Sequence, residues 1–334
     1  MTDTAAPDVS HNSPVSGHGP LDPGLAAVLD GVTLAPDGLH ATVDGRELTA
    51  ETGRQLRQEL IGAVYEAFHV GHVFGEQRPR SFRDPWLEER LAARTPHTTT
   101  PVPAVPYRPE GEGAGGADSR IAVIGGLRVR LTGAREFTDG TVRLPAARPG
   151  LSPGFFLVDG SRGTTARGAV LRLYLQLDDP DEAIRLWGGT LRHLEDAGVG
   201  YRAKVTSSRQ LFPRRDGLVV YLGRDAWDIV PGLVEEVRQP AKAGREEPAS
   251  PFAKSLAPGV AIAWEPRDER PGRRGMSFGQ HRAAAVVDAL FDTLEGRPGE
   301  IGRSPDECLI RRLKEANIDP AAVYRNADSP NPGW

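Results

Sequence analysis

The chain has 334 residues, with 45 acidic against 41 basic side chains and a single cysteine, Cys308. The net charge of −4 argues against a general nucleic-acid-binding protein, and one cysteine excludes an internal disulfide and a multi-cysteine zinc site. The sequence holds no apolar run long enough to cross a membrane, and residues 1–20 lack the pattern of a secretory signal. We therefore expect a protein of the reducing cytoplasm, without nucleic acid or membrane as a partner.

The N-terminal part of the chain is predicted to be helical and to end in a linker. Residues 1–20 are expected to form a disordered leader, and residues 21–93 a helical region with a turn at TVDGREL, residues 42–48. Residues 94–119 are rich in proline, threonine and glycine, which predicts a linker or a loop.

The strongest helix signal in that region lies around residues 49–71. Apolar residues recur every four positions and would form one face: Leu56, Leu60, Val64 and Phe68. Thr49 or Thr52 would cap this helix, and Gly71 would end it.

From residue 120 the pattern changes to strands mixed with helices. The absence of a regular βαβ rhythm predicts an α+β fold, with a mixed, mostly antiparallel sheet and packed helices. We expect residues 120–300 to form this domain and residues 301–334 a last helix and a frayed tail. Strands are predicted at 120–133, 155–160, 169–177, 201–206, 217–223 and 257–264, and helices at 180–199, 224–239, 277–296 and 304–317.

Two lysines stand out in the strand-rich part. Lys204 lies inside a predicted strand, where it shares a face with Arg202 opposite Ala203 and Val205. This polar face is either a charged, solvent-facing edge or part of a site. A lysine that loses solvent beside other cations can serve as a base. The second, Lys254, follows an apolar Pro-Phe pair.

Arginines surround these lysines. Arg214 and Arg215 precede Asp216 in a predicted turn, which is either a charged surface turn or an arginine fork for a phosphate, with Asp216 orienting one guanidinium. Arg282 is placed at the start of the helix at 277–296, where a cation opposes the helix dipole and a bound anion would relieve the conflict. The alternative is a helix capped by Ser277 with Arg282 on its surface.

The histidines predict no metal site. His69 and His72 lack the spacing of a metalloprotease motif and have no further ligand cluster, so we expect neither a metal nor a cofactor. His281, beside Arg282, is a candidate acid, while His193 is expected on a helix surface. Glycine-rich segments lack the context of a nucleotide loop, which disfavours a phosphate-binding transferase.

The order of these segments resembles a known family. RLYLQL, a helix, GVGYRAKV, RRDGLVVYL, PFAKSLAPGVAIAWEP and SFGQHRAAAVVDAL, within roughly residues 165–295, are similar to the HopA-type type III effector family. Proteins similar to these serve as lyases in the biosynthesis of class V lanthipeptides and thioamitides. The family also looks distantly like the OspF-type phosphothreonine lyases, which use a lysine base and no metal.

The resemblance implies a metal-independent β-elimination in bacteria. A separate kinase-like partner would phosphorylate a precursor peptide, and this protein would remove the phosphate to leave dehydroalanine or dehydrobutyrine. A non-catalytic partner that binds the peptide or the kinase, or an effector-like binding protein, remains the alternative.

The resemblance also implies roles for particular residues. Lys204 is assigned as the base by its order in the motif, and Lys254 is exchangeable with it. The phosphate and carbonyl clamp would comprise Arg215, Lys254 and Arg282, with Asp216 orienting an arginine and Arg172 as a further candidate. Tyr174 or His281 would donate a proton to the leaving group.

Overall fold

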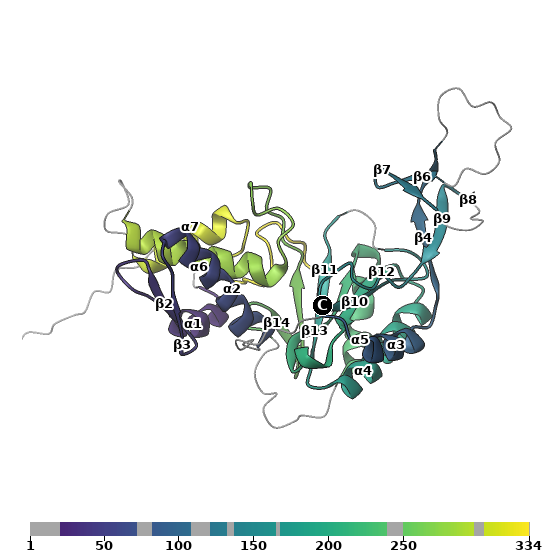
Figure 1. The fold of residues 1–334 in the computed structure, drawn as a ribbon, viewed down its shortest axis with the longest axis horizontal. Coiled ribbons are helices and arrows are strands. Elements are labelled where there is room, and N and C mark those ends of the chain that lie inside the picture. Colours follow the sequence, from purple (N-terminus) through teal and green to yellow (C-terminus); the bar gives the residue numbers. More distant parts are fainter. Residues whose placement is uncertain are drawn as a thin grey trace, which may run out of the picture.

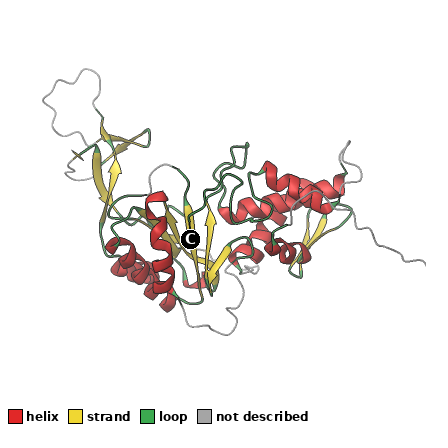
Figure 2. Ribbon diagram, turned by 180° about the vertical axis from the view of Figure 1, so that it is seen from behind, coloured by secondary structure: helices red, strands yellow, loops and turns green. Residues whose placement is uncertain are grey.

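The computed structural model describes residues 21–71, 82–107, 121–131, 137–164, 168–238, 250–296 and 304–333. Its centre is a six-stranded sheet with a group of helices on either side (Figures 1 and 2). The predicted α+β class is confirmed, and every pair of neighbouring strands in the sheet is antiparallel. In spatial order the strands are β10 (Phe155–Asp159), β12 (Tyr201–Thr206), β13 (Arg214–Leu222), β11 (Leu171–Leu177), β15 (Val260–Trp264) and β14 (Lys254–Ala257).

One face of this sheet packs against helices to form a large apolar core. Leu171, Leu173 and Leu175 of β11 point into it, as their alternation with polar residues predicted. The covering helices are α3 (Pro85–Arg94), α4 (Pro180–Asp196) and α5 (Val230–Val237), which appear as one group in Figure 1. The segment predicted as one helix at 224–239 is a 3₁₀ helix, η3 (Arg224–Ile229), followed by α5, which has Pro231 in its first turn.

The other face meets a second body built from both ends of the chain. Its core combines Tyr174, Val219 and Ala263 of the sheet with apolar residues of the N-terminal region and of the last helices. The elements of this body are α1 (Pro23–Asp30), β1 (Val32–Leu34), β2 (His40–Val43), β3 (Arg46–Thr49), α2 (Gly53–Val64), the π-helix η1 (Tyr65–Val70), α6 (Phe278–Glu295) and α7 (Pro305–Glu315). The expected boundaries at residues 93 and 300 therefore do not separate independent cores.

The predicted helix at 49–71 is confirmed with its signals. The Thr52 hydroxyl accepts a hydrogen bond from the backbone N–H of Gln55, and Gly71 ends η1 with φ of 72°. The expected turn within residues 42–48 joins β2 to β3. The region expected to be helical thus also contains a three-stranded sheet, which completes the second core.

The C-terminal segment after α7 is packed rather than frayed. Ile318, Val323 and Asn326 are buried, and the backbone N–H of Trp264 donates to the carbonyl of Tyr324. The sequence predicted a frayed tail because this segment is mostly polar. Hydrogen bonds to its backbone carbonyls, and not only its apolar side chains, hold it in place.

Part of the expected linker forms strands. β4 (Thr99–Pro103) pairs with β9 (Thr141–Pro145), which also pairs with β8 (Phe137–Thr138), and β5 (Val105–Pro106) joins β6 (Ile121–Ile124) and β7 (Leu127–Arg130). These two small sheets form an arm that projects from the main body (Figure 1). Residues 108–119 of the expected linker and the expected leader at 1–20 lie outside the described residues. No helix in the described segments is long and apolar enough to span a bilayer.

Candidate functional site

A charged and aromatic cluster lies on the sheet face that meets the second body. Arg172 on β11 and Lys204 on β12 both project from this face, as the alternation of the two strands predicted. β13 adds Tyr221, which lies opposite Arg172 on one side and Arg202 on the other. The central strands thereby present several cations in a largely apolar setting.

Lys204 is the cation of this cluster with the fewest polar contacts. Its side chain is half-buried, and Nζ lies 4.1 Å from the centroid of the Phe155 ring and 6.0 Å from that of Tyr221. Among the described residues, neither a hydrogen bond nor an ion pair involves this ammonium group. Aromatic rings attract a cation but do not neutralise it, so Lys204 keeps the capacity to bind an anion.

Arg214 and Asp216 form a buried ion pair beside Lys204. Arg214 donates from Nε to Asp216 Oδ1 over 2.5 Å and from Nη2 to Oδ2 over 3.2 Å, and its guanidinium lies 4.7 Å from the same Phe155 ring. Burial alone would raise the pKa of Asp216, but Arg214 and His69 outweigh it, so the pKa falls below its usual value. The salt bridge expected for Asp216 is present, and Arg214 is its partner.

The position of these two residues differs from the predicted turn. Arg214 is already the first residue of β13, so both lie within the sheet. A register shift between β11 and β13 near Leu175 and Leu177 allows Arg214 and Asp216 to contact the second body. A local turn signal at Pro213-Arg-Arg-Asp-Gly does not reveal such a bulge, because it depends on the partner strand.

His69 belongs to the cluster and was not predicted to do so. Its Nδ1 lies 3.1 Å from the Ser250 hydroxyl, and its Nε2 lies 3.9 Å from Asp216 Oδ2. The ring packs against Tyr174 and Phe278 at centroid distances of 5.3 and 5.6 Å. Burial lowers the pKa of His69 to about 4, an effect that Asp216 opposes and the nearby cations reinforce.

Helix α6 approaches His69 through a glycine. A Cβ atom at Gly279 would lie 2.3 Å from His69 Cδ2, a distance that atoms cannot adopt. The glycine therefore allows the first turn of α6 to pack directly on the imidazole. No local pattern marks His69 as a site residue, because Ser250 and Asp216 are far away in the sequence.

Arg172 and Tyr174 extend the cluster along β11. Arg172 is buried, donates from Nε to Glu265 and lies 3.3 Å through Nη1 from the Tyr174 hydroxyl. Its guanidinium stands 5.0 Å from the Tyr221 ring. Burial raises the pKa of Tyr174 above its ordinary value although Arg172 opposes the shift, so the phenol keeps its proton near neutral pH.

The model of the HopA1 effector protein family matches residues 146–325, which is more than half of the chain. The chain belongs to the HopA1 effector protein family. The matched range contains the whole six-stranded sheet and α6, and thus Lys204, Arg214 and Arg172, whereas His69 precedes it.

Two solved structures are similar to this chain. The effector protein from Pseudomonas syringae pv. syringae strain 61 gives a TM-score of 0.46 at 15% identity, with 82% of this chain and 92% of that chain covered. The effector protein from Pseudomonas syringae pv. tomato strain DC3000 gives 0.44 at 13% identity, with 82% and 95% covered. The search of curated proteins gave no match.

Within this HopA1-family fold, Arg282 serves the C-terminal segment. It is buried in the second turn of α6 and donates from Nε to the carbonyl of Val323 over 2.9 Å and from Nη2 to that of Arg325 over 3.2 Å. Burial lowers its pKa to about 9. Together with the Asn326 side chain and the imidazole of His281, these carbonyls occupy its donors within its own chain.

His281 lies between Asp268 and Arg282 in a buried chain of hydrogen bonds. Its Nε2 lies 2.9 Å from Asp268 Oδ2, and Arg282 Nη1 lies 2.8 Å from its Nδ1. Because Arg282 can only donate, the imidazole accepts at Nδ1 and donates at Nε2. Burial, with Arg282 adding to the effect, lowers the pKa of His281 to about 4. Both ring nitrogens of this candidate acid are thus occupied.

The structure does not bring Lys254 to the cluster. Lys254 is exposed on the edge strand β14, opposite Ile262, and its Nζ lies 5.7 Å from the Tyr324 ring. Three strands separate β14 from β12, which at the usual strand spacing amounts to roughly 19 Å. Ile262 also belongs to the core on the opposite face, so Lys254 and Lys204 lie on different sides of the sheet.

Arg215 lies at the border of the cluster. Its Nη1 donates to the carbonyls of Ala67 and Phe68, each over 3.3 Å, and ties β13 to the end of η1. Gly71 permits this contact, because a Cβ atom there would meet the Arg215 side chain at 2.8 Å. Of the predicted site residues, Lys204, Arg172, Tyr174 and Asp216 are therefore in one cluster, with Arg215 beside it.

Proposed function

We propose that this protein is a phosphoserine/phosphothreonine lyase that acts on a phosphorylated precursor peptide in lanthipeptide or thioamitide biosynthesis, without a metal. The observation that carries the proposal is Lys204, a half-buried lysine near Arg214 and Arg172 that makes no hydrogen bond or direct ion pair with a described carboxylate. Membership of the HopA1 effector protein family is compatible with such an activity. A kinase-like protein in the bacterial cytoplasm would supply the phosphopeptide.

Lys204 acts as the base in the proposed reaction. In its neutral form, Nζ takes the α-proton of the phosphorylated residue, and the released electron pair forms the Cα–Cβ double bond. The Cβ–O bond breaks, and phosphate leaves with its electron pair. A positioned base contributes about 10²–10⁴ in rate, so the charges around it must supply much of the remaining acceleration.

The cations of the cluster stabilise the charge that develops in this step. Arg214 and Arg172 stand closest to the aromatic rings that hold Lys204, and both are fixed by carboxylates, Asp216 and Glu265 respectively. Fixed guanidinium groups suit a phosphate and an enolate-like carbonyl, because they need not reorganise during the reaction. Arg215 is a further candidate for the phosphate, and Tyr174 for the proton that the leaving group takes up.

The test is mass spectrometry of phosphoserine and phosphothreonine peptides incubated with the full chain. We expect loss of phosphoric acid, abolished by Lys204→Ala and by Lys204→Arg, which retains a cation but cannot act as a base near neutral pH. Lys254→Ala is the matched control and should leave the rate unchanged. Full activity of Lys204→Ala would overturn the assignment of the base.

A binding protein of the same pathway is the second candidate. The contacts of Arg282 with backbone carbonyls and the remote position of Lys254 favour it, because two of the expected clamp residues do not face the cluster. If the native precursor peptide and its kinase-like partner also give no loss of phosphate, while the phosphopeptide binds to the wild-type protein, this second function is correct.

A further inference from the structure

An arginine-lined pocket lies on the opposite side of the sheet from Lys204, between α3 and α4. The pocket has a volume of about 360 Å³ and is lined by Arg94, Asp181, Ile184, Arg185, Gly188 and Arg192. Its residues on α4 recur every three or four positions, so they form one stripe on the outer surface of that helix. The function proposed above uses none of them.

The floor of this pocket is made by a glycine. Gly188 and Gly189 lie in the middle of α4, where each costs about 1 kcal/mol relative to alanine. A Cβ atom at Gly188 would lie 3.3 Å from Arg192 Nη1 and 3.4 Å from Arg94 Cβ. The glycine thus brings the two arginines together across the helix pair, which gives a packing reason for an otherwise unfavourable residue.

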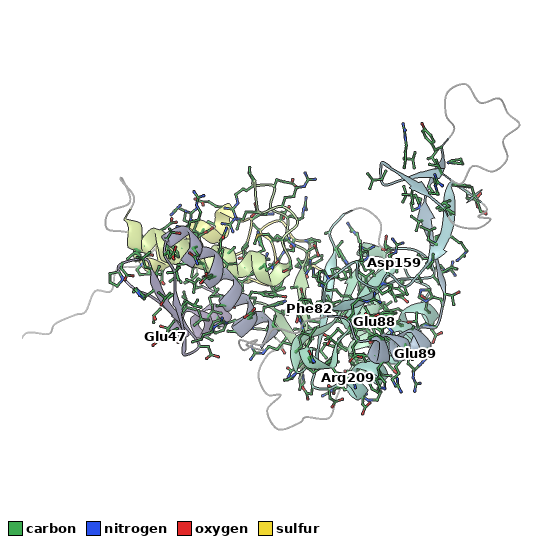
Figure 3. The ribbon with its side chains drawn as sticks, viewed as in Figure 1. Glu47, Phe82, Glu88, Glu89, Asp159 and Arg209 are labelled. Atoms are coloured by element: carbon green, nitrogen blue, oxygen red, sulfur yellow. The ribbon has the colours of Figure 1, made fainter. Side chains whose placement is uncertain are left out.

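The charge of the pocket is positive and partly unneutralised. Arg94 and Arg192 are exposed, and among the described residues neither has a carboxylate or another hydrogen-bond partner. Arg185 lies 3.9 Å from Glu182, and Asp181 is the one acid of the lining. Glu88 of α3, labelled in Figure 3 next to Glu89, does not line the pocket, because it pairs with Arg83. The guanidinium groups of Arg94 and Arg192, which have no described carboxylate partner, suit a ligand with several negative charges.

We propose that this pocket docks an acidic segment of the peptide substrate, at a distance from the residue that reacts. The identity of the peptide as a substrate rests on the proposed function, but the binding itself does not. Guanidinium groups bind carboxylates in a bidentate manner, and exposed arginines on a helix pair can contact successive acidic residues.

The position of the pocket sets a minimum spacing in the peptide. Sheet and helix layers lie about 10 Å apart, and the pocket is on the outer surface of α4, so a peptide must pass around the edge of the sheet to reach Lys204. A path on the order of 30 Å corresponds to roughly nine extended residues. The acidic segment and the phosphorylated residue are therefore expected to be separated by at least this length.

The test measures binding without requiring catalysis. A fluorescent, unphosphorylated peptide of glutamates and glycines is titrated with the full chain and followed by anisotropy at low and at physiological salt. Arg94→Ala/Arg192→Ala should weaken binding about tenfold or more, because two charge-assisted contacts are lost. Arg54→Ala/Arg274→Ala makes the same change of net charge on the second body and should change binding less than about twofold.

A charge-reversed pair makes the result specific. Arg94→Glu/Arg192→Glu should reject the acidic peptide and instead bind a lysine-rich peptide of the same length. Equal binding of the acidic peptide to the wild type and the Arg94→Ala/Arg192→Ala variant would overturn the proposal, as would no binding to the wild type at low salt. Loss of binding to a kinase-like partner, with peptide binding unchanged, would assign the pocket to that partner instead. Because the peptide carries no phosphate, its binding to the pocket can be measured even if the protein does not catalyse the elimination reaction.

Discussion

The stability of this protein should fall as the pH is lowered from 6.5 towards 4, because two histidines are buried in neutral form. Burial lowers the pKa of both His69 and His281 to about 4, from 6.5 in an unfolded chain. Below pH 6.5 the unfolded chain therefore binds two protons that the folded chain does not bind until about pH 4. Protons taken up only by the unfolded state favour unfolding, so the free energy of unfolding decreases through this window.

The size of the effect follows from the two pKa values. At pH 5 an unfolded histidine is almost fully protonated and the folded one is mostly neutral, which costs about 2 kcal/mol for each residue. The wild type should thus lose about 4 kcal/mol of unfolding free energy between pH 7.5 and 5. The buried carboxylates Asp216 and Asp268 have lowered pKa values, so their contribution is lost only as the pH falls below about 4.

Urea denaturation at pH 7.5, 6 and 5 measures this dependence. His69→Gln should reduce the loss at pH 5 by about 2 kcal/mol whatever its effect at pH 7.5, since the slope and not the intercept is compared. An unchanged slope in His69→Gln would contradict the assignment of a buried neutral imidazole.

Three further changes test the packing and the cluster. Gly279→Ala forces a Cβ atom against His69 and should cost about 1–3 kcal/mol in thermal denaturation, whereas Gly62→Ala, where nothing lies within 4 Å, should be neutral or stabilising. Asp292→Ala removes the carboxylate of α6 that binds Arg311 and Arg312 of α7. Urea denaturation at pH 7 should show a loss of about 3 kcal/mol in the free energy of unfolding. The control Glu269→Ala, which changes an exposed carboxylate, should have almost no effect. Phe155→Leu keeps an apolar side chain but removes the ring beside Lys204 and Arg214, so elimination should slow about fivefold, for about 1 kcal/mol; an unchanged rate would show that the ring does not position Lys204.

Elements with strong local patterns could be predicted from the sequence. The alternation in β11, the helix from Thr52 to Gly71 and the capped helix α6 all depend on residues a few positions apart, and all three are confirmed. The small sheet β1 to β3 and strand β14 were missed because short strands become stable only through their partners. Strands β4 and β5 of the arm were predicted as part of a linker, because proline-rich strands at a sheet edge look like a loop when they are read alone, whereas β6 and β7 lie within the strand segment predicted at 120–133.

The candidate site was predictable only where side chains share a strand face. Lys204 and Arg172 could be placed on the polar faces of their strands, because a strand alternates with a period of two. His69 could not be placed, since its neighbours Ser250 and Asp216 are 181 and 147 residues further along the chain. Arg282 was predicted to bind an anion, but it donates instead to backbone carbonyls of a segment about 40 residues later in the chain.

The partners of each cation distinguish structural charges from those available for chemistry. Arg282 is held by backbone carbonyls, Arg214 by Asp216 and Arg172 by Glu265, so each of these guanidinium groups is fixed in place before any ligand arrives. A buried charge that had no partner would cost several kcal/mol, which explains why the arginines carry theirs. Lys204 is only half-buried and rests on aromatic rings, so it can remain without a carboxylate at a smaller cost. Among the described cations of the cluster, Lys204 is the one without a hydrogen-bonded or ion-paired partner, so it is the one best able to interact with a substrate, and the fixed arginines around it set the field in which it does so.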